Sequence, residues 1–175
     1  MDNLLSFSAD LGAALKARSL KLALAESCTG GMASQYITAI AGSSAWFDRA
    51  FISYSNQAKM DMLDVSQQTL DIFGAVSEQT AQAMAIGAIK NSLADISASI
   101  TGIAGPEGGS ENKPVGMVCF GFAFKTSSFK NELSQLNAQV ITQTKQFIGN
   151  RDDIRKQSVN HVLETLITLT LSLDL

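Results

Sequence analysis

Hydrophobic and polar positions follow two alternating spacings along the chain. Leu4, Leu11 and Leu15 recur at helical intervals, whereas residues 20–25 form a short apolar run that is typical of a buried strand. Both patterns then recur. They predict further strands at residues 46–55, 94–101, 117–124 and 139–147, and further helices at residues 31–40, 56–65, 66–75, 77–93 and from about residue 152 onward.

Strands that alternate with helices predict an α/β protein. We expect a three-layer sandwich, with a mostly parallel or mixed central sheet and helices on both faces. No internal repeat or linker interrupts the 175 residues, so a single domain is expected. Ligands of such sheets bind outside the carboxyl ends of the strands. The turn at residues 27–31, the segment after Tyr54 and the loop after Thr101 are therefore expected to converge on one site.

Composition and charge exclude several classes of function. The chain is 46% hydrophobic and its formal net charge is −3, whereas a general nucleic-acid binder carries a basic face. We therefore expect no nucleic-acid partner. No apolar run is long enough to span a membrane, and two cysteines cannot build a disulfide framework, so a reduced, cytoplasmic protein is expected. The apolar C-terminal helix favours a homo-oligomer.

The segment AESCTGG places two potential nucleophiles, Ser27 and Cys28, between a predicted strand and a predicted helix. Free backbone N–H groups at such a junction favour negative charge. The alternative is that Ser27 or Thr29 only caps the helix that follows. Local spacing is compatible with both interpretations.

A long glycine-rich loop, TGIAGPEGGSENKPVG, follows the predicted strand that ends at Thr101. Its glycines would let backbone amides approach a phosphate or a carboxylate closely. The segment matches neither the Walker pattern nor a dinucleotide-binding fingerprint. A long hairpin-like connection is the alternative, and the loop itself does not decide between them.

The single histidine, His161, lies among apolar residues of the last predicted helix, which favours a partly buried structural role. Neither a Ser-His-Asp triad nor a zinc site is therefore expected. A serine can instead be activated by a neutral lysine. Lys59 directly follows the strand that ends near Tyr54, at one of the three convergent segments. As an isolated residue it would be an ordinary helix-surface lysine, and it lies too far from Ser27 for a local Ser-x-x-Lys motif.

Five segments occur in one order along residues 20–157: AESCTGG, AGSSAWFDRAFISYSNQAK, GAVSE, TGIAGPEGGSENKPVG and GNRDDIRKQ. Together they resemble the CinA C-terminal domain family. The resemblance implies an amidase that acts on a pyridine nucleotide, hydrolysing the carboxamide of nicotinamide mononucleotide to nicotinate mononucleotide and ammonia in pyridine-nucleotide salvage. It also implies Ser27 as the nucleophile and Lys59 as its base, with no cofactor and no metal.

Acyl transfer by this pair requires an oxyanion hole. The backbone N–H groups of residues 29–31, or that of Gly102, are expected to supply it. The hydroxyl groups of Tyr54 and Thr101 are expected to orient the dyad or the amide by hydrogen bonds. The alternative is that each residue only marks the end of a strand. Two arginines at the start of the last helix are candidates for the substrate phosphate, or surface charges that balance neighbouring aspartates. The predicted substrate-binding residues are Thr29, Gly30, Gly31, Tyr54, Thr101, Gly102, Gly105, Arg151 and Arg155.

A second class of function remains open from the sequence. A member of this family can keep the pocket without turnover, as a non-catalytic nucleotide- or partner-binding module, because a fold does not dictate a reaction. Longer CinA proteins also carry an N-terminal domain associated with ADP-ribose pyrophosphatase activity. No segment here resembles that domain, so no pyrophosphatase activity is expected.

Overall fold

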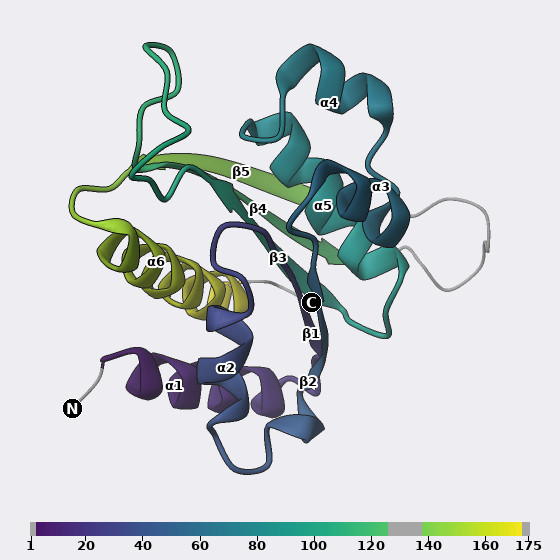
Figure 1. Ribbon diagram of the computed structural model, residues 1–175. Coiled ribbons are helices and arrows are strands. Elements are labelled where there is room, and N and C mark those ends of the chain that lie inside the picture. Colours follow the sequence, from purple (N-terminus) through teal and green to yellow (C-terminus); the bar gives the residue numbers. More distant parts are fainter. Residues whose placement is uncertain (1–2, 126–137, 173–175) are drawn as a thin grey trace.

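The computed structural model describes residues 3–125 and 138–172, which form a layered α/β molecule (Figure 1). Its strands make one mixed sheet in the order β2-β1-β3-β4-β5. The strands are β1 (Leu22–Glu26), β2 (Phe47–Ile52), β3 (Ile96–Gly102), β4 (Met117–Lys125) and β5 (Ala138–Gln146). The helices are α1 (Asn3–Ala17), α2 (Met32–Thr38), α3 (Asn56–Leu63), α4 (Gln67–Phe73), α5 (Glu78–Lys90) and α6 (Arg151–Ser172), with a short 3₁₀ helix, η1 (Ser43–Ala45). The predicted fold class is confirmed.

The order of the strands brings three distant segments to one edge of the sheet. β1 lies between β2 and β3 and is parallel to both, whereas β4 and β5 continue the sheet in antiparallel pairing. Parallel strands end at the same edge, so the segments that follow Glu26, Ile52 and Gly102 meet there. The predicted convergence of these segments is confirmed. The glycine-rich loop connects β3 to its antiparallel neighbour β4, as a long hairpin connection does.

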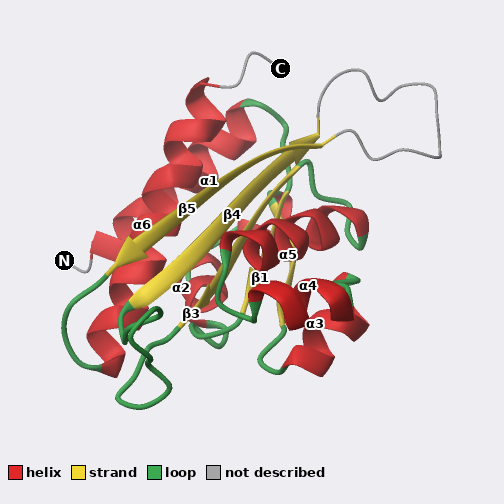
Figure 2. Cartoon of the chain, turned by 90° about the horizontal axis from the view of Figure 1, so that it is seen from above, coloured by secondary structure: helices red, strands yellow, loops and turns green. Residues whose placement is uncertain are grey.

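The two faces of the sheet differ in the size of their side chains. Leu22 and Leu24 of β1 pack into a core shared with α1, α2 and α6, whereas Ala23 and Ala25 face the helices on the other side. Figure 1 shows α1, α2 and α6 on one side of the sheet and α3, α4 and α5 on the other, and Figure 2 shows the same layers from above. This alternation places large side chains on one face and small ones on the other.

Small and hydroxyl side chains hold α5 close to the sheet. Ser97 Oγ of β3 donates to the carbonyl of Ala85 at 2.7 Å, and Ser99 Oγ donates to that of Ala81 at 2.6 Å. A Cβ atom added at Gly121 would lie 2.5 Å from Ala81 O, so β4 needs a glycine at this position. The close packing of α5 also determines where the segment before this helix lies, beside the convergent edge.

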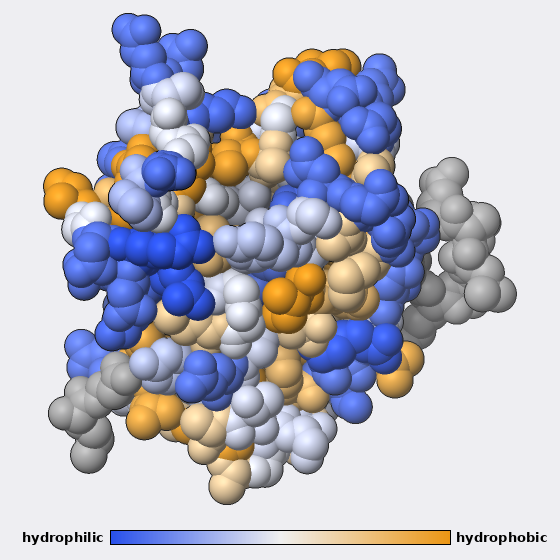
Figure 3. Space-filling model, viewed as in Figure 1, coloured by the Kyte–Doolittle hydropathy of each residue, from blue (hydrophilic) through white to orange (hydrophobic). Residues whose placement is uncertain are grey.

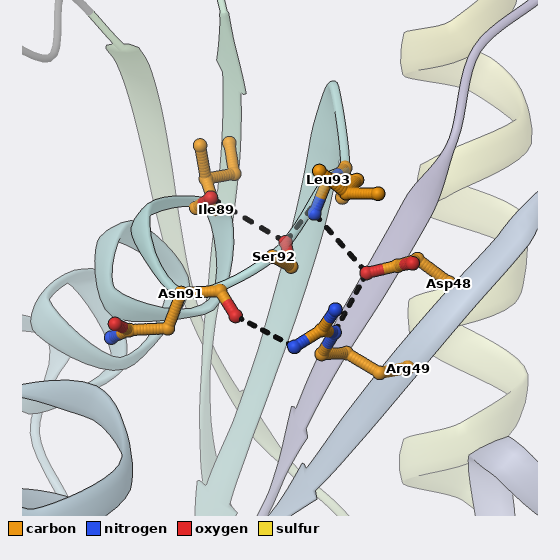
Figure 4. A network of polar contacts seen from close by, with 7 residues as sticks. Asp48, Arg49, Ile89, Asn91, Ser92 and Leu93 are labelled. Atoms are coloured by element: carbon orange, nitrogen blue, oxygen red, sulfur yellow. Dashed lines mark hydrogen bonds and ion pairs between the residues drawn. The ribbon is translucent and has the colours of Figure 1, made fainter.

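The alanine-rich helix ends earlier than the sequence predicts, at Lys90 rather than Leu93. The residues after it form a polar network with the start of β2 (Figure 4). Asp48 accepts hydrogen bonds from the backbone N–H of Leu93 at 3.2 Å and from Arg49 Nε at 2.7 Å. Arg49 also donates to the carbonyl of Asn91 at 3.2 Å. This tertiary network favours a turn over further helix, at the end of β2 opposite to the convergent edge.

The contacts of His161 are those of a residue with a structural role. Its Nε2 lies 2.7 Å from Gln143 Oε1, and its ring packs against Phe120 with 4.7 Å between ring centroids. Burial lowers the pKa of this imidazole, which favours its neutral form. The partly buried structural role predicted for His161 is confirmed.

Within residues 3–125 and 138–172, no helix combines the length and the apolar character needed to cross a bilayer.

Candidate active site

The turn after β1 brings Ser27 against Lys59. Lys59 Nζ lies 3.1 Å from Ser27 Oγ and 3.0 Å from the carbonyl oxygen of Ser53. Only 7% of Ser27 and 1% of Lys59 is exposed. α3 delivers the lysine because it begins directly after β2, where Ser55 Oγ accepts a hydrogen bond from the backbone N–H of Ala58. Pairing of β1 with β2 thus joins two residues that are 32 positions apart.

Burial acts in opposite directions on the lysine and on the neighbouring cysteine. It lowers the pKa of Lys59, because the charged amine loses its hydration in the interior. The neutral amine can accept a proton from Ser27. Burial raises the pKa of Cys28 to about 12, so this thiol stays protonated at neutral pH. The electrostatics therefore favour Ser27 over Cys28 as the nucleophile.

A residue that the sequence analysis missed, Glu26, fixes the turn that carries the nucleophile. Its fully buried carboxylate accepts hydrogen bonds from the backbone N–H groups of Gly31 (3.0 Å), Ala33 (3.2 Å) and Ser34 (2.9 Å), and from the Ser34 hydroxyl. This carboxylate caps the start of α2, where the sequence suggested a hydroxyl of the turn. The signal in the sequence was an acidic residue shortly before a helix.

A cavity of about 280 Å³ opens above the dyad, at the carboxyl edge of the parallel strands. Figure 3 shows hydrophilic surface over the start of α6 and over α3, on either side of this region. The predicted site residues that line the cavity are Ser27, Tyr54, Lys59, Thr101, Gly102, Gly105 and Arg151. Thr29, Gly30, Gly31 and Arg155 lie outside its lining.

Arg151 joins two walls of the cavity at its mouth. One guanidinium nitrogen donates to the carbonyl of Gly105 at 2.7 Å, and another donates to the hydroxyl of Tyr54 at 3.1 Å. Tyr54 follows β2 and is 61% exposed, whereas Gly105 belongs to the loop after β3. Tyr54 is therefore a residue of the rim, held by Arg151 rather than by the dyad.

Arg155 lies one turn further along α6 and donates to the carbonyl of Thr29 at 2.8 Å. Together with Arg151 it lines a neighbouring cavity of about 440 Å³. Among the residues that the structure describes, its Nε has no hydrogen-bond partner although the atom is buried. Arg155 therefore lies beside the neighbouring cavity and not at the dyad.

Thr101 supports a wall of the cavity. Its hydroxyl donates to the carbonyl of Ala75 at 2.7 Å, which fixes the segment between α4 and α5 against the end of β3. Val76, the next residue of that segment, lines the cavity. The structure thus connects Thr101 to the wall of the cavity, with no hydrogen bond to either member of the dyad.

Two of the backbone amides expected at the oxyanion hole already have other acceptors. Gly30 N–H donates to Ser27 O at 3.1 Å, and Gly31 N–H donates to Glu26. The two glycines have φ values of 57° and 95°, so they serve the left-handed geometry of the turn. Directly after β3, Ile103 N–H donates to Met117 O of β4 at 2.9 Å. The N–H of the preceding residue, Gly102, therefore points to the opposite side, towards the end of β1.

Fold and site together define a class of protein: a three-layer α/β protein with a buried serine–lysine contact in a cavity at the carboxyl edge of its sheet. The described ranges contain no cluster of three or more His, Cys, Asp or Glu residues that could hold a metal ion. A family model described as the CinA C-terminal domain matches residues 5–170, and the chain belongs to this family.

Several known proteins are similar to the chain over most of its length. Nicotinamide-nucleotide amidohydrolase PncC of Escherichia coli strain K12 is 48% identical over 163 residues, which cover 93% of this chain and 92% of that protein. The protein of the same name from Enterobacter agglomerans is 48% identical over 91% of each chain. The crystal structure of competence/damage inducible protein CihA from Agrobacterium tumefaciens matches with a TM-score of 0.86 and 40% identity, covering 97% of this chain and 96% of that one.

Proposed function

We propose that this protein is a nicotinamide-nucleotide amidohydrolase, which converts nicotinamide mononucleotide to nicotinate mononucleotide and ammonia in cytoplasmic pyridine-nucleotide salvage. Two relatives that bear this name match about nine-tenths of the chain at 48% identity. The observation that carries the proposal is the contact between Ser27 and Lys59 at the floor of the cavity, 3.1 Å from oxygen to nitrogen.

In the acylation step, neutral Lys59 takes the proton of the Ser27 hydroxyl while Ser27 Oγ attacks the carboxamide carbon. The carbonyl of Ser53 accepts one N–H of the lysine at 3.0 Å, which helps to aim the lone pair of Nζ at Ser27. The protonated lysine then returns its proton to the departing nitrogen. Ammonia leaves, and the nicotinoyl group remains bound to Ser27 as an ester.

In the deacylation step, a water molecule attacks that ester while Lys59 takes a proton from the water, and the protonated lysine then returns this proton to the departing Ser27 Oγ. The products are nicotinate mononucleotide and free Ser27. Both steps pass through a negatively charged tetrahedral intermediate, which must be stabilised by hydrogen-bond donors. Gly102 N–H is the donor best oriented for this role, because its strand directs it towards the end of β1 and Gly102 lines the cavity.

The substrate phosphate would bind at the mouth of the cavity, where Arg151 and Arg155 start α6. In the structure the two side chains donate to neutral oxygens of Gly105, Tyr54 and Thr29. A phosphate is a stronger acceptor than a carbonyl or a hydroxyl, because charge-assisted hydrogen bonds are about twice as strong as neutral ones. The arginines would therefore exchange these acceptors for the phosphate when the substrate binds.

The proposal is tested by incubating the purified protein with nicotinamide mononucleotide and measuring both products. Equal amounts of ammonia and nicotinate mononucleotide are expected, with much slower turnover of nicotinamide riboside, which lacks the phosphate. Activity is expected to survive exhaustive chelation. Saturable binding of the nucleotide without any product would contradict the proposal and would favour a non-catalytic binding module.

A further inference from the structure

Among the described residues, one carboxylate lines the cavity above the dyad, that of Glu107. Glu107 lies in the loop between β3 and β4, two residues beyond the Gly105 carbonyl that accepts from Arg151. It is solvent-exposed, and no ion pair or hydrogen bond of its side chain is found within the described residues. Neither the reaction steps nor the packing of the loop therefore account for its charge.

The charged groups of the cavity are complementary to a zwitterion. In the part of the chain that the structure describes, three basic or acidic side chains line it: Lys59, Arg151 and Glu107. Lys59 must be neutral to act as the base, so the reactive form of the site presents one cation and one anion. Arg151 is the cation, at the start of α6, and Glu107 is the anion, on the facing loop. A ligand that satisfies both carries a negative and a positive group.

We propose that Glu107 determines specificity by selecting substrates whose aromatic ring is positively charged, as the pyridinium ring of nicotinamide mononucleotide is. This inference rests on the proposed function. The pyridinium ring lies next to the carboxamide that meets Ser27, so the positive charge enters the cavity together with the reacting group. The phosphate then extends towards Arg151. Free nicotinamide, which has a neutral ring and no phosphate, satisfies neither charge.

The attraction between Glu107 and the ring is moderate, because the carboxylate is exposed and water screens it. Opposite charges at an exposed site contribute up to about a fivefold change in affinity. Tyr54 lines the same cavity, and an aromatic face adds attraction for a cation. Glu107 is therefore expected to change substrate binding and to leave the rate of the bound complex nearly unchanged.

The test compares Glu107→Gln with Glu111→Gln. Glu111 lies in the same loop and its substitution changes the net charge equally, but it does not line the cavity. Each variant is assayed with nicotinamide mononucleotide as the substrate and with its reduced form as a competitive inhibitor. The reduced form has nearly the same shape, but its dihydropyridine ring is neutral. The measured quantity is the ratio of the Ki of the reduced form to the KM of the substrate.

Glu107→Gln is expected to lower this ratio about two- to fivefold, through a higher KM, with kcat within about twofold of the wild-type value. Glu111→Gln is expected to leave the ratio unchanged. An unchanged ratio in Glu107→Gln, or an equal increase of KM and Ki, would overturn the inference, since the carboxylate would then not sense the charge of the ring.

Failure of the proposed function gives a different result from failure of this inference. If the wild-type protein forms no nicotinate mononucleotide, the proposed function fails. The dissociation constants of the oxidised and reduced nucleotides, measured by titration calorimetry, then replace KM and Ki. Preferential binding of the oxidised form that is lost in Glu107→Gln would still support charge selection, and equal binding of both forms would overturn it.

Discussion

The floor and the rim of the cavity are built from opposite kinds of residue. On the floor, Ser27 and Lys59 are 7% and 1% exposed, and burial lowers the pKa of the lysine. On the rim, Tyr54, Glu107 and Arg151 are exposed, and two of them carry charge. Burial favours the neutral form of Lys59, which can take a proton from Ser27. A charged ligand is instead recognised by exposed groups that it can reach. Substitutions on the floor should therefore change kcat, and substitutions on the rim should change KM.

Of the two substitutions that compare the floor with the rim, the larger effect is expected from Lys59→Met, which removes the base and keeps an unbranched side chain of similar length. We expect kcat to fall about 10³-fold with KM changed less than about threefold, because a general base contributes 10²- to 10⁴-fold. Steady-state kinetics measure kcat and KM, and thermal melting shows whether the variant is folded. Lys90→Met is the control: Lys90 is an exposed lysine that pairs with Asp64. An equal loss of kcat in Lys90→Met would contradict the assignment of Lys59 as the base.

The pH dependence sharpens the same comparison. Because only neutral Lys59 can act as the base, kcat should rise about tenfold per pH unit below the pKa of Lys59 and reach a plateau before about pH 10.4, the ordinary value for lysine. The unfolded chain binds the additional proton between these two pKa values. The free energy of unfolding should therefore rise with pH in that window. Lys59→Met should lose this rise, as chemical denaturation at several pH values would show.

A smaller effect is expected on the rim from Arg151→Gln. Loss of the guanidinium should raise KM for nicotinamide mononucleotide about tenfold, since a hydrogen bond to a charged group contributes about 1.5–3 kcal/mol, and should leave kcat within about threefold. Arg49→Gln is the matched control, because Arg49 belongs to the network at the opposite end of β2 (Figure 4). A decrease confined to kcat would place Arg151 with the reacting groups of the floor.

The fold was largely predictable from the sequence, because both faces of its three central strands, β1, β3 and β4, are buried. Apolar runs such as residues 20–25 identify the strands, and Ser77 identifies the start of α5, where its hydroxyl accepts from the backbone N–H of Thr80. Element ends were less accurate. α5 stops at Lys90 because the residues after it bond to Asp48 and Arg49, more than forty positions away in the chain. Local spacing carries no information on such a contact.

The candidate site was predictable as a set of segments, but not as a set of contacts. Ser27 meets Lys59 only because β2 pairs beside β1, and strand order cannot be derived from periodicity. Glu26 was missed because its carboxylate acts through backbone amides of the following turn. Arg155 was predicted to bind the substrate together with Arg151, but its contact with Thr29 and its place beside the neighbouring cavity depend on the packing of α6.

The assignment of Ser27 as the nucleophile is tested by comparing Ser27→Ala with Cys28→Ala. The measured quantity is the ammonia released from nicotinamide mononucleotide. Ser27 is hydrogen-bonded to Lys59, whereas burial raises the pKa of Cys28 to about 12. Ser27→Ala is expected to lose about 10⁴-fold or more of the wild-type kcat, and Cys28→Ala is expected to stay within about threefold of it. Turnover that survives in Ser27→Ala and disappears in Cys28→Ala would contradict the assignment.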